Sequence, residues 1–320
     1  DYRDWDLTIN GVTNRSTEYH TSAITDLAID WIDSQARPWF LWLAYVAPHT
    51  PFHMPPEGLH TQSLSGTDAD ISANPRDYYL AAIEAMDTEI GRLLSGMSEA
   101  ERDNTLVIYM GDNGTPSRAA DRSVYADGTK GSFTEGGLRV PMVVSGKGVN
   151  RQSAREDALI NSSDLFATIV ELAGSAVTEI EDSLSFAALL GINGTNTREY
   201  IYSDFEGDSV SGWAVRDARY KLITTVDGQR QLYDLDAERS ESEDLLAGGG
   251  DYADIVERLA EVAASIRQTD GGDTDTDGET LLIDITGEIF TQRSGNCQDY
   301  IDEYQATSMD IFRSVLFTAN

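Results

Sequence analysis

Two short segments of the chain carry side chains capable of chemistry at the ends of predicted strands. The first, Ala47-Pro-His-Thr-Pro51, holds His49 between two prolines directly after a continuous apolar run. The second, Gly111-Asp-Asn-Gly114, sets the carboxylate of Asp112 beside the amide of Asn113. Carboxylate and amide oxygens are the hard ligands that calcium and magnesium prefer. We therefore predict a metal site at Asp112 and Asn113.

A third segment, residues 127–141, holds a lysine in a glycine-rich loop before the chain returns to a buried strand. The chain has 55 Asp and Glu against 23 Lys and Arg, a net charge of −32, and Lys130 is one of only three lysines. Glu135 and Arg139 lie in the same segment. These two could form a buried structural pair or reach a cleft, and we favour the structural role.

Helix and strand patterns alternate through the first 198 residues. Helical spacing of apolar residues predicts helices over 21–35, 77–97 and 163–173, and short continuous apolar runs predict buried strands over 39–47, 105–110 and 138–145. This alternation predicts an α/β fold, a mainly parallel sheet flanked by helices. In such a sheet, functional groups gather beyond the carboxyl ends of the strands, which is where His49 and Asp112 lie.

The pattern changes after Glu199 to short strands separated by turn residues, over 200–202, 213–216, 219–225 and 231–235, followed by a helix over 252–266. We expect four units: the α/β domain over 1–198, an antiparallel C-terminal subdomain with its helix over 199–268, an acidic linker over 269–279, and the start of an incomplete further module over 280–320. Residues 273–278 also match the start of a calcium loop, but we favour the linker.

The composition excludes several classes of partner. A net charge of −32 argues against nucleic acid and anionic membrane surfaces. The longest apolar run, Trp39–Ala47, is far shorter than the roughly 18 residues that a membrane-spanning helix needs. A lone Cys297 excludes an internal disulfide framework. The acid excess along the chain favours a secreted or periplasmic protein.

Together the motifs resemble the sulfatase family, within the alkaline-phosphatase-like superfamily. The resemblance rests on Pro-His-Thr-Pro at 48–51, Asp-Asn-Gly at 112–114, Lys-Gly at 130–131 and Glu-Gly-Gly-Leu-Arg-Val-Pro at 135–141. Residues 214–223 and 232–235 resemble the family's C-terminal subdomain. The matched segments keep the family's order over about residues 15–247, so the chain resembles the last two thirds of a sulfatase.

The resemblance implies a role for each motif. Asp112 and Asn113 would be two ligands of a calcium ion that holds the sulfate group. His49 and Lys130 would be catalytic and substrate-binding residues, contacting the sulfate oxygens and the leaving oxygen. The implied function is calcium-dependent hydrolysis of sulfate esters. The implied partner is a sulfated small molecule or a sulfated polysaccharide.

One family feature is expected to be missing. Sulfatases use a formylglycine nucleophile, made from the first residue of a Cys/Ser-x-Pro/Ala-x-Arg motif upstream of every segment matched here. We expect that motif to be absent from this chain and to belong to a missing upstream segment, and we therefore expect this fragment alone to be inactive. Thr115-Pro-Ser-Arg118 resembles the motif's tail, but Gly114 stands at the nucleophile position.

Two other functions stay open. The same superfamily pocket serves phosphodiester and phosphonate ester hydrolysis, and comparing matched aryl sulfate and aryl phosphate esters separates this activity from sulfate hydrolysis. The chain could instead be a noncatalytic remnant that binds a sulfated glycan, which predicts binding without turnover.

Overall fold

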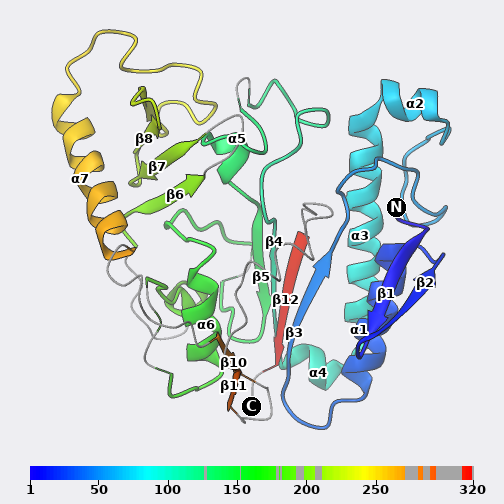
Figure 1. Ribbon diagram of the computed structural model, residues 1–320. Coiled ribbons are helices and arrows are strands. Elements are labelled where there is room, and N and C mark those ends of the chain that lie inside the picture. Colours follow the sequence, from blue (N-terminus) through cyan, green and yellow to red (C-terminus); the bar gives the residue numbers. More distant parts are fainter. Residues whose placement is uncertain are drawn as a thin grey trace.

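The computed structural model describes residues 1–125, 128–151, 153–177, 180, 182–191, 198–205, 211–270, 280–283, 289–292 and 312–318. Two four-stranded sheets dominate the described part of the chain. Figure 1 shows the central sheet between helices α1 and α3 on one side and α6 on the other, with the second sheet and α7 beyond.

The chain opens with a hairpin that the periodicity analysis missed, formed by β1 (Trp5–Ile9) and β2 (Val12–Ser16). Its two-residue turn is Asn10-Gly11, with φ values of 50° and 77°. Asn-Gly is a strong signal for a tight hairpin because both residues tolerate positive φ. That dipeptide could have predicted the hairpin.

Helices α1 (His20–Asp33) and α3 (Pro75–Gly96) pack against each other and against the first central strand. Ala28 and Ile32 of α1 and Met86 and Leu93 of α3 are buried in one apolar cluster with that strand. Proline at the first position of α3 suits a helix start, since its missing N–H would have no partner there. Both helices are confirmed as predicted, with boundaries shifted by one or two residues.

The central sheet has the order β3-β12-β4-β5, with β3 (Phe40–Tyr45), β12 (Phe312–Thr318), β4 (Thr105–Met110) and β5 (Met142–Gly146). All three described pairings are antiparallel. The prediction of a mainly parallel sheet is therefore wrong for the described residues, although β3 and β4 run in the same direction on either side of β12. The helix–strand alternation did not anticipate a strand from the C-terminal end of the chain.

Shorter helices connect these elements. They are α2 (Asp68–Ala73), α4 (Glu99–Asp103), α5 (Glu135–Leu138), α6 (Asp164–Leu172) and the 3₁₀ helix η1 (Ala187–Leu190). The strand expected over 138–145 begins only at Met142: α5 ends at Leu138, and Pro141, which has no N–H to donate to a strand ladder, directly precedes β5.

The second sheet is the predicted antiparallel meander, in the order β6-β7-β8-β9. Its strands are β6 (Ile201–Phe205), β7 (Gly212–Arg216), β8 (Tyr220–Thr225) and β9 (Arg230–Asp234). Helix α7 (Ala253–Asp270) covers this sheet and buries Leu259 against Val215, Leu222 and Leu232. These four apolar side chains are fully buried.

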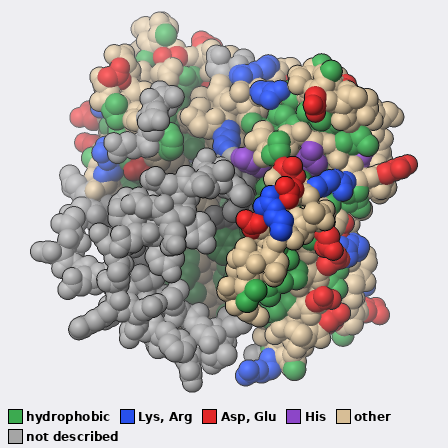
Figure 2. Space-filling view, turned by 45° about the vertical axis from the view of Figure 1, so that its right-hand side comes forward, with side chains coloured by type: hydrophobic (Ala, Val, Ile, Leu, Met, Phe, Trp, Pro, Cys, Tyr) green, Lys and Arg blue, Asp and Glu red, His purple; other side chains and the backbone are tan. Residues whose placement is uncertain are grey.

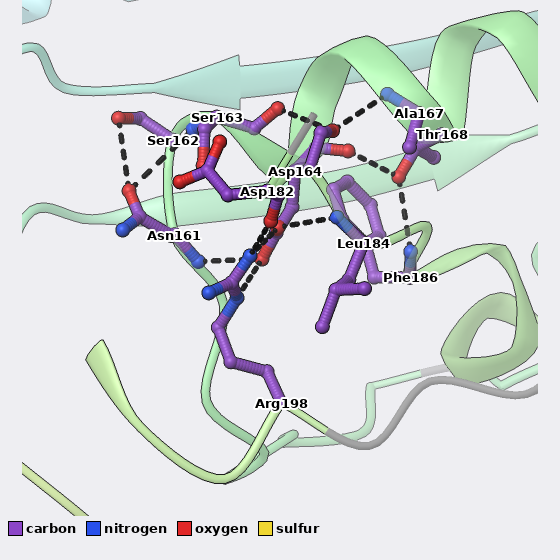
Figure 3. A network of polar contacts seen from close by, with 11 residues as sticks. Asn161, Ser162, Ser163, Asp164, Ala167, Thr168, Asp182, Leu184, Phe186 and Arg198 are labelled. Carbon is purple, nitrogen blue, oxygen red and sulfur yellow. Dashed lines mark hydrogen bonds and ion pairs between the residues drawn. The ribbon is translucent and has the colours of Figure 1, made fainter. Parts of the chain in front are cut away.

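A buried carboxylate fastens the start of α6 to the segment that leads to β6 (Figure 3). Asp164 accepts hydrogen bonds from the backbone N–H groups of Asn161 and Leu184, both at 2.8 Å, and from the guanidinium of Arg198. Arg198 also donates to the carbonyl of Asp182 at 2.6 Å. Asp164, Asn161, Asp182, Leu184 and Arg198 are called the Asp164 cluster below.

The acidic segment expected as a linker lies outside the described residues, apart from its first two positions in α7. Of residues 280–320, the structure describes only the hairpin β10 (Thr280–Ile283) and β11 (Ile289–Gln292), and β12. Cys297 lies outside the described residues. Within the described part of the chain, every helix falls short of the length and apolarity needed to cross a bilayer.

Candidate functional site

The ends of β3 and β4 lie at one edge of the central sheet. Arg313 of β12 stands opposite Ala44 of β3 on one side and opposite Met110 of β4 on the other. Two strand spacings separate Ala44 from Met110, or about 10 Å. The loops that carry His49 and Asp112 therefore leave the sheet at the same level.

The loop after β3 holds His49 in a fixed orientation. The backbone N–H of His49 donates to Val46 O at 2.9 Å, and the Tyr2 hydroxyl donates to His49 O at 2.9 Å. Nδ1 of His49 lies 2.6 Å from Thr50 O, a distance at which Nδ1–H donates to the carbonyl. Nε2 is then the ring atom able to accept a proton.

The loops that carry Asp112 and Lys130 are joined through their backbones. The N–H of Gly114 donates to Gly137 O at 2.9 Å, and the N–H of Lys130 donates to Thr115 O at 3.0 Å. At the strand end, Gly111 N–H donates to Pro141 O at 3.0 Å. The structure thus brings Asp112, Asn113 and Lys130 together.

The two loops can approach this closely only because glycines stand at their points of contact. A Cβ atom at Gly114 would lie 2.0 Å from Gly136 O, and one at Gly136 would lie 2.5 Å from Gly128 O. No side chain fits at such distances. The glycine-rich composition of residues 128–137 therefore has a packing reason.

The electrostatics of Lys130 follow from its half-buried position. Burial lowers the pKa of Lys130, and the nearby Asp112 carboxylate opposes this by raising it. Burial also raises the pKa of Tyr79, whose side chain bonds to Thr115 and lies near Asp112. A cation, a carboxylate and a phenol thus meet at the end of β4.

A cleft of about 1290 Å³ begins at this point, lined by Asp112, Asn113 and Thr115 and continuing along β5 toward the second sheet. Five arginines also line it: Arg139, Arg151, Arg155, Arg216 and Arg239. Five carboxylates line it as well, those of Asp112, Glu135, Glu156, Asp157 and Asp236. Four of the arginines form ion pairs with these carboxylates, so basic and acidic side chains alternate along the cleft.

The residues at the end of β4 fit calcium in the kind of donor they offer. Asp112 and Asn113 supply carboxylate and amide oxygens, whereas calcium takes roughly six to eight oxygen ligands. Within the described residues, no group of three or more His, Cys, Asp or Glu side chains is placed to hold a metal ion. The described chain could therefore supply two ligands of a calcium site and not a complete one.

Figure 2 shows histidine side chains close together on one face of the molecule. His53 stacks on Tyr2 at 3.9 Å between ring centroids and bonds to the Tyr19 hydroxyl at 3.1 Å. Burial lowers the pKa of His53 to about 4, so its ring is neutral at pH 7. His53 packs against these two tyrosines, and His20 is the first residue of α1.

Glu135 is buried, as the structural interpretation required, but its partner is not Arg139. Glu135 Oε1 lies 3.2 Å from Lys221 Nζ, and Glu135 Oε2 lies 3.3 Å from Arg216. Arg139 is exposed and lines the cleft. Arg216 and Lys221 could not be predicted from the sequence because they lie on β7 and β8, about 80 residues from Glu135. The sequence analysis also did not identify Tyr2 and Tyr79.

The prediction that the Cys/Ser-x-Pro/Ala-x-Arg motif is absent from this chain is wrong at the level of sequence, since Ser98-Glu-Ala-Glu-Arg102 matches the motif. Ser98 is the N-cap of α4, where its Oγ accepts from Glu101 N–H at 3.2 Å. Helix α4 precedes β4, so Ser98 lies at the opposite end of that six-residue strand from Asp112, roughly 20 Å away. Ser98 caps a helix and is too distant to attack at this site.

The sequence profile of the family described as Sulfatase matches residues 2–175, more than half of the chain. The chain belongs to the sulfatase family. A second profile, described as N-sulphoglucosamine sulphohydrolase, C-terminal, matches residues 129–269 of this sulfatase-family chain. The two matches overlap over the loop that carries Lys130 and Glu135.

Curated relatives agree with this assignment. The sulfatase-family chain is 22% identical to choline-sulfatase of Rhizobium meliloti over 251 residues, which cover 67% of this chain and 47% of the relative. It is also 22% identical to arylsulfatase G of Rattus norvegicus over 277 residues, covering 75% and 50%. The chain spans about half the length of the curated relatives it matches.

Solved structures share the fold. The crystal structure of Ps i-CgsB in complex with k-i-k-neocarrahexaose superposes with a TM-score of 0.66 at 25% identity, covering 88% of this chain and 61% of that chain. A phosphonate monoester hydrolase of Agrobacterium radiobacter has a TM-score of 0.59 at 21% identity, covering 86% and 65%. These neighbours support the alkaline-phosphatase-like α/β fold.

Proposed function

We propose that this chain is part of a calcium-dependent hydrolase of sulfate esters. Membership of the sulfatase family supports the reaction class. The observation that carries the proposal is the junction of Asp112 and Asn113 with Lys130, at the sheet edge from which the His49 loop also leaves.

Each residue has a role that follows from its chemistry. Asp112 and Asn113 would hold calcium, which supplies positive charge that neutralises a bound sulfate group. Lys130 would contact sulfate oxygens, since a half-buried ammonium interacts more strongly with an anion than one in water. His49 would act through Nε2 toward the leaving oxygen, because Thr50 O engages Nδ1.

The proposal requires a nucleophile from polypeptide outside these 320 residues. We propose a formylglycine, in keeping with the family resemblance, and we expect residues 1–320 alone to give no turnover. Mass spectrometry of the natural full-length protein tests for the aldehyde. An unmodified residue at a motif there would overturn this part of the proposal.

The substrate we propose is a sulfated small molecule or a sulfated polysaccharide, met in a secreted or periplasmic setting. A cleft of about 1290 Å³, lined by both basic and acidic side chains, is large enough for more than a single sulfate group. A neighbour of the same fold, Ps i-CgsB, was solved in complex with k-i-k-neocarrahexaose.

The decisive experiment measures hydrolysis of 4-nitrophenyl sulfate by the natural full-length protein with calcium and after chelation. We expect activity that is lost on chelation, and a loss of about 100-fold in kcat for Lys130→Met, similar to the removal of one oxyanion donor. Lys147→Met is the matched control, since Lys147 follows β5 at the other end of the sheet. Absent hydrolysis in calcium would overturn the proposal.

A second candidate activity is phosphonate or phosphodiester ester hydrolysis. The fold shared with a phosphonate monoester hydrolase favours its inclusion in the assay. Rates on matched aryl sulfate, aryl phosphonate and bis-aryl phosphate esters separate the two, and a faster phosphorus ester would replace sulfate hydrolysis as the function. Binding of a sulfated glycan without turnover by the full-length protein would indicate a noncatalytic remnant.

A further inference from the structure

Four charged side chains form a buried cluster where the α/β domain meets the second sheet. Lys221 Nζ lies 3.2 Å from Glu135 Oε1 and 2.9 Å from Glu241 Oε1, and Arg216 lies 3.3 Å from Glu135 Oε2. The side chains of Lys221 and Glu135 are 1% and 4% exposed. These four residues are called the Glu135 cluster.

The Glu135 cluster holds the backbone as well as the side chain of Glu135. The N–H of Glu135 donates to the carboxylate of Glu241. Two carboxylates face two cations, so the charges balance inside the protein. A buried charge that loses its partner is costly, which makes this arrangement resistant to displacement.

Glu135 is the first residue of α5, and the loops of the candidate site are built on that helix. Gly136 and Gly137, the next two residues, contact the Asp112 loop, and Gly137 O accepts the N–H of Gly114. Ser132 donates to Thr129 O at 2.7 Å beside Lys130. Because glycine backbones touch directly in this region, a shift of Glu135 must move both loops.

We propose that Glu135 is a positioning residue for the candidate site: the second sheet, through Arg216 and Lys221, sets the relative placement of Lys130 and the Asp112–Asn113 pair. The proposal rests on the proposed function for the identity of the ligand, calcium. The physical link runs from β7 and β8 through the Glu135 carboxylate to α5, and from α5 to the backbone of residues 111–115 and 128–131. Glu135 itself need not touch calcium or substrate.

The test uses the natural full-length protein and the near-isosteric variant Glu135→Gln, which keeps the side-chain volume and removes the charge that holds Lys221 and Arg216. Calcium alone is titrated by calorimetry, under conditions where wild type and variant are both folded by circular dichroism. We expect Kd for calcium to rise about tenfold, as for other residues that orient metal ligands without binding the metal.

Arg198→Met is the matched control. It breaks a buried carboxylate–guanidinium contact of similar burial, with Arg198 and Asp164 at 11% and 0% exposed, next to α6, away from α5 in Figure 1. We expect the control to lower the melting temperature while leaving the calcium Kd within twofold of wild type. Equal weakening in both variants would show a general loss of stability and would overturn the positioning role.

Hydrogen–deuterium exchange provides a readout that does not depend on calcium. We expect Glu135→Gln to accelerate exchange at the amides of Gly114 and Lys130, and Arg198→Met to leave these amides protected. Unchanged exchange and unchanged Kd in Glu135→Gln would overturn the inference. If wild type binds no calcium while exchange responds as expected, the proposed function fails and the positioning role stands.

Discussion

The Glu135 cluster and the Asp164 cluster are both built around a buried carboxylate, but the residues that they join are separated by different distances along the chain. The side-chain partners of Glu135 lie 81 and 86 residues away, on strands of the second sheet. The partners of Asp164 lie 3, 20 and 34 residues away, around one helix. Similar chemistry thus serves a local fastening in one place and a junction between two sheets in the other.

The two carboxylates are also satisfied in different ways. Asp164 accepts two backbone N–H bonds besides Arg198, so it keeps donors if the arginine is lost. Glu135 depends on two cationic side chains, and Lys221 is shared with a second carboxylate. We conclude that removing one cation should cost more at the Glu135 cluster than at the Asp164 cluster.

The largest effect is expected for Lys221→Met. This change leaves the carboxylates of Glu135 and Glu241 buried side by side with Arg216 as the remaining cation, and we expect a loss of about 4 kcal/mol in the free energy of unfolding. Urea denaturation followed by tryptophan fluorescence measures it. A loss below about 1 kcal/mol would show that the buried charges are not coupled as their distances imply.

A smaller loss is expected for Arg198→Met, about 2 kcal/mol in the free energy of unfolding, since two backbone donors still satisfy Asp164. The same denaturation experiment measures it. Calcium affinity should stay at the wild-type value, in contrast to the weaker calcium affinity expected for Glu135→Gln. If Arg198→Met proves the more destabilising of the two, the contrast between the clusters is wrong.

Local sequence patterns predicted most of the helices and strands, and the elements that they failed to predict have physical causes. Helices α1, α3, α6 and α7 and the meander β6–β9 were predicted because each has an amphipathic stripe or short strands between turn residues. The direction of the central sheet was mispredicted, since β12 pairs with β3 and β4 from about 200 residues or more along the chain. No local pattern encodes such a pairing.

The candidate site likewise contains residues that could be predicted from the sequence and residues that could not. Asp112, Asn113, Lys130 and His49 could be proposed from the sequence because each stands in a short motif at a strand end or in a glycine-rich loop. Lys221 and Arg216 could not, because their role depends on the packing of the second sheet against α5. The substitution Ser98→Ala separates a motif match from a function.

Ser98→Ala provides a reference outside both clusters, with an expected loss of about 1 kcal/mol. The serine closes a capping box with Glu101 at the start of α4, and loss of an N-cap hydroxyl costs about this much. Thermal unfolding detects the change. Calcium affinity and sulfate ester hydrolysis should be unaltered, and a loss of hydrolysis in the full-length protein would restore Ser98 as a nucleophile.

A smaller effect at neutral pH than that of Lys221→Met is expected for Glu241→Gln, which leaves Lys221 paired with Glu135. Burial raises the pKa of Glu241 above the model-peptide value of 4.5, with Lys221 opposing this shift. The burial cost of the charged form thus offsets part of what the ion pair with Lys221 contributes, so an amide should be tolerated better here than the loss of the cation at Lys221.

The pH dependence of this small effect sharpens the comparison. A carboxyl with a raised pKa in the folded state binds its proton more tightly there than in the unfolded chain, so its contribution to stability is complete below pH 4.5 and is lost as pH rises through the folded pKa. The stability of wild type relative to Glu241→Gln should therefore fall from pH 4.5 upward and then level off. Urea unfolding of both proteins between pH 4 and 8 measures this difference.

Glu84→Gln is the control of opposite sign. Hydrogen bonds from Thr61 and Gln62 lower the pKa of Glu84 below 4.5, so its contribution is present above pH 4.5 and is lost as pH falls through the lowered value. The stability of wild type relative to Glu84→Gln should thus fall toward acid, whereas relative to Glu241→Gln it falls away from acid. Parallel profiles for the two glutamates would mean that folding lowers the pKa of Glu241 as it lowers that of Glu84, which would contradict the effect of burial at Glu241.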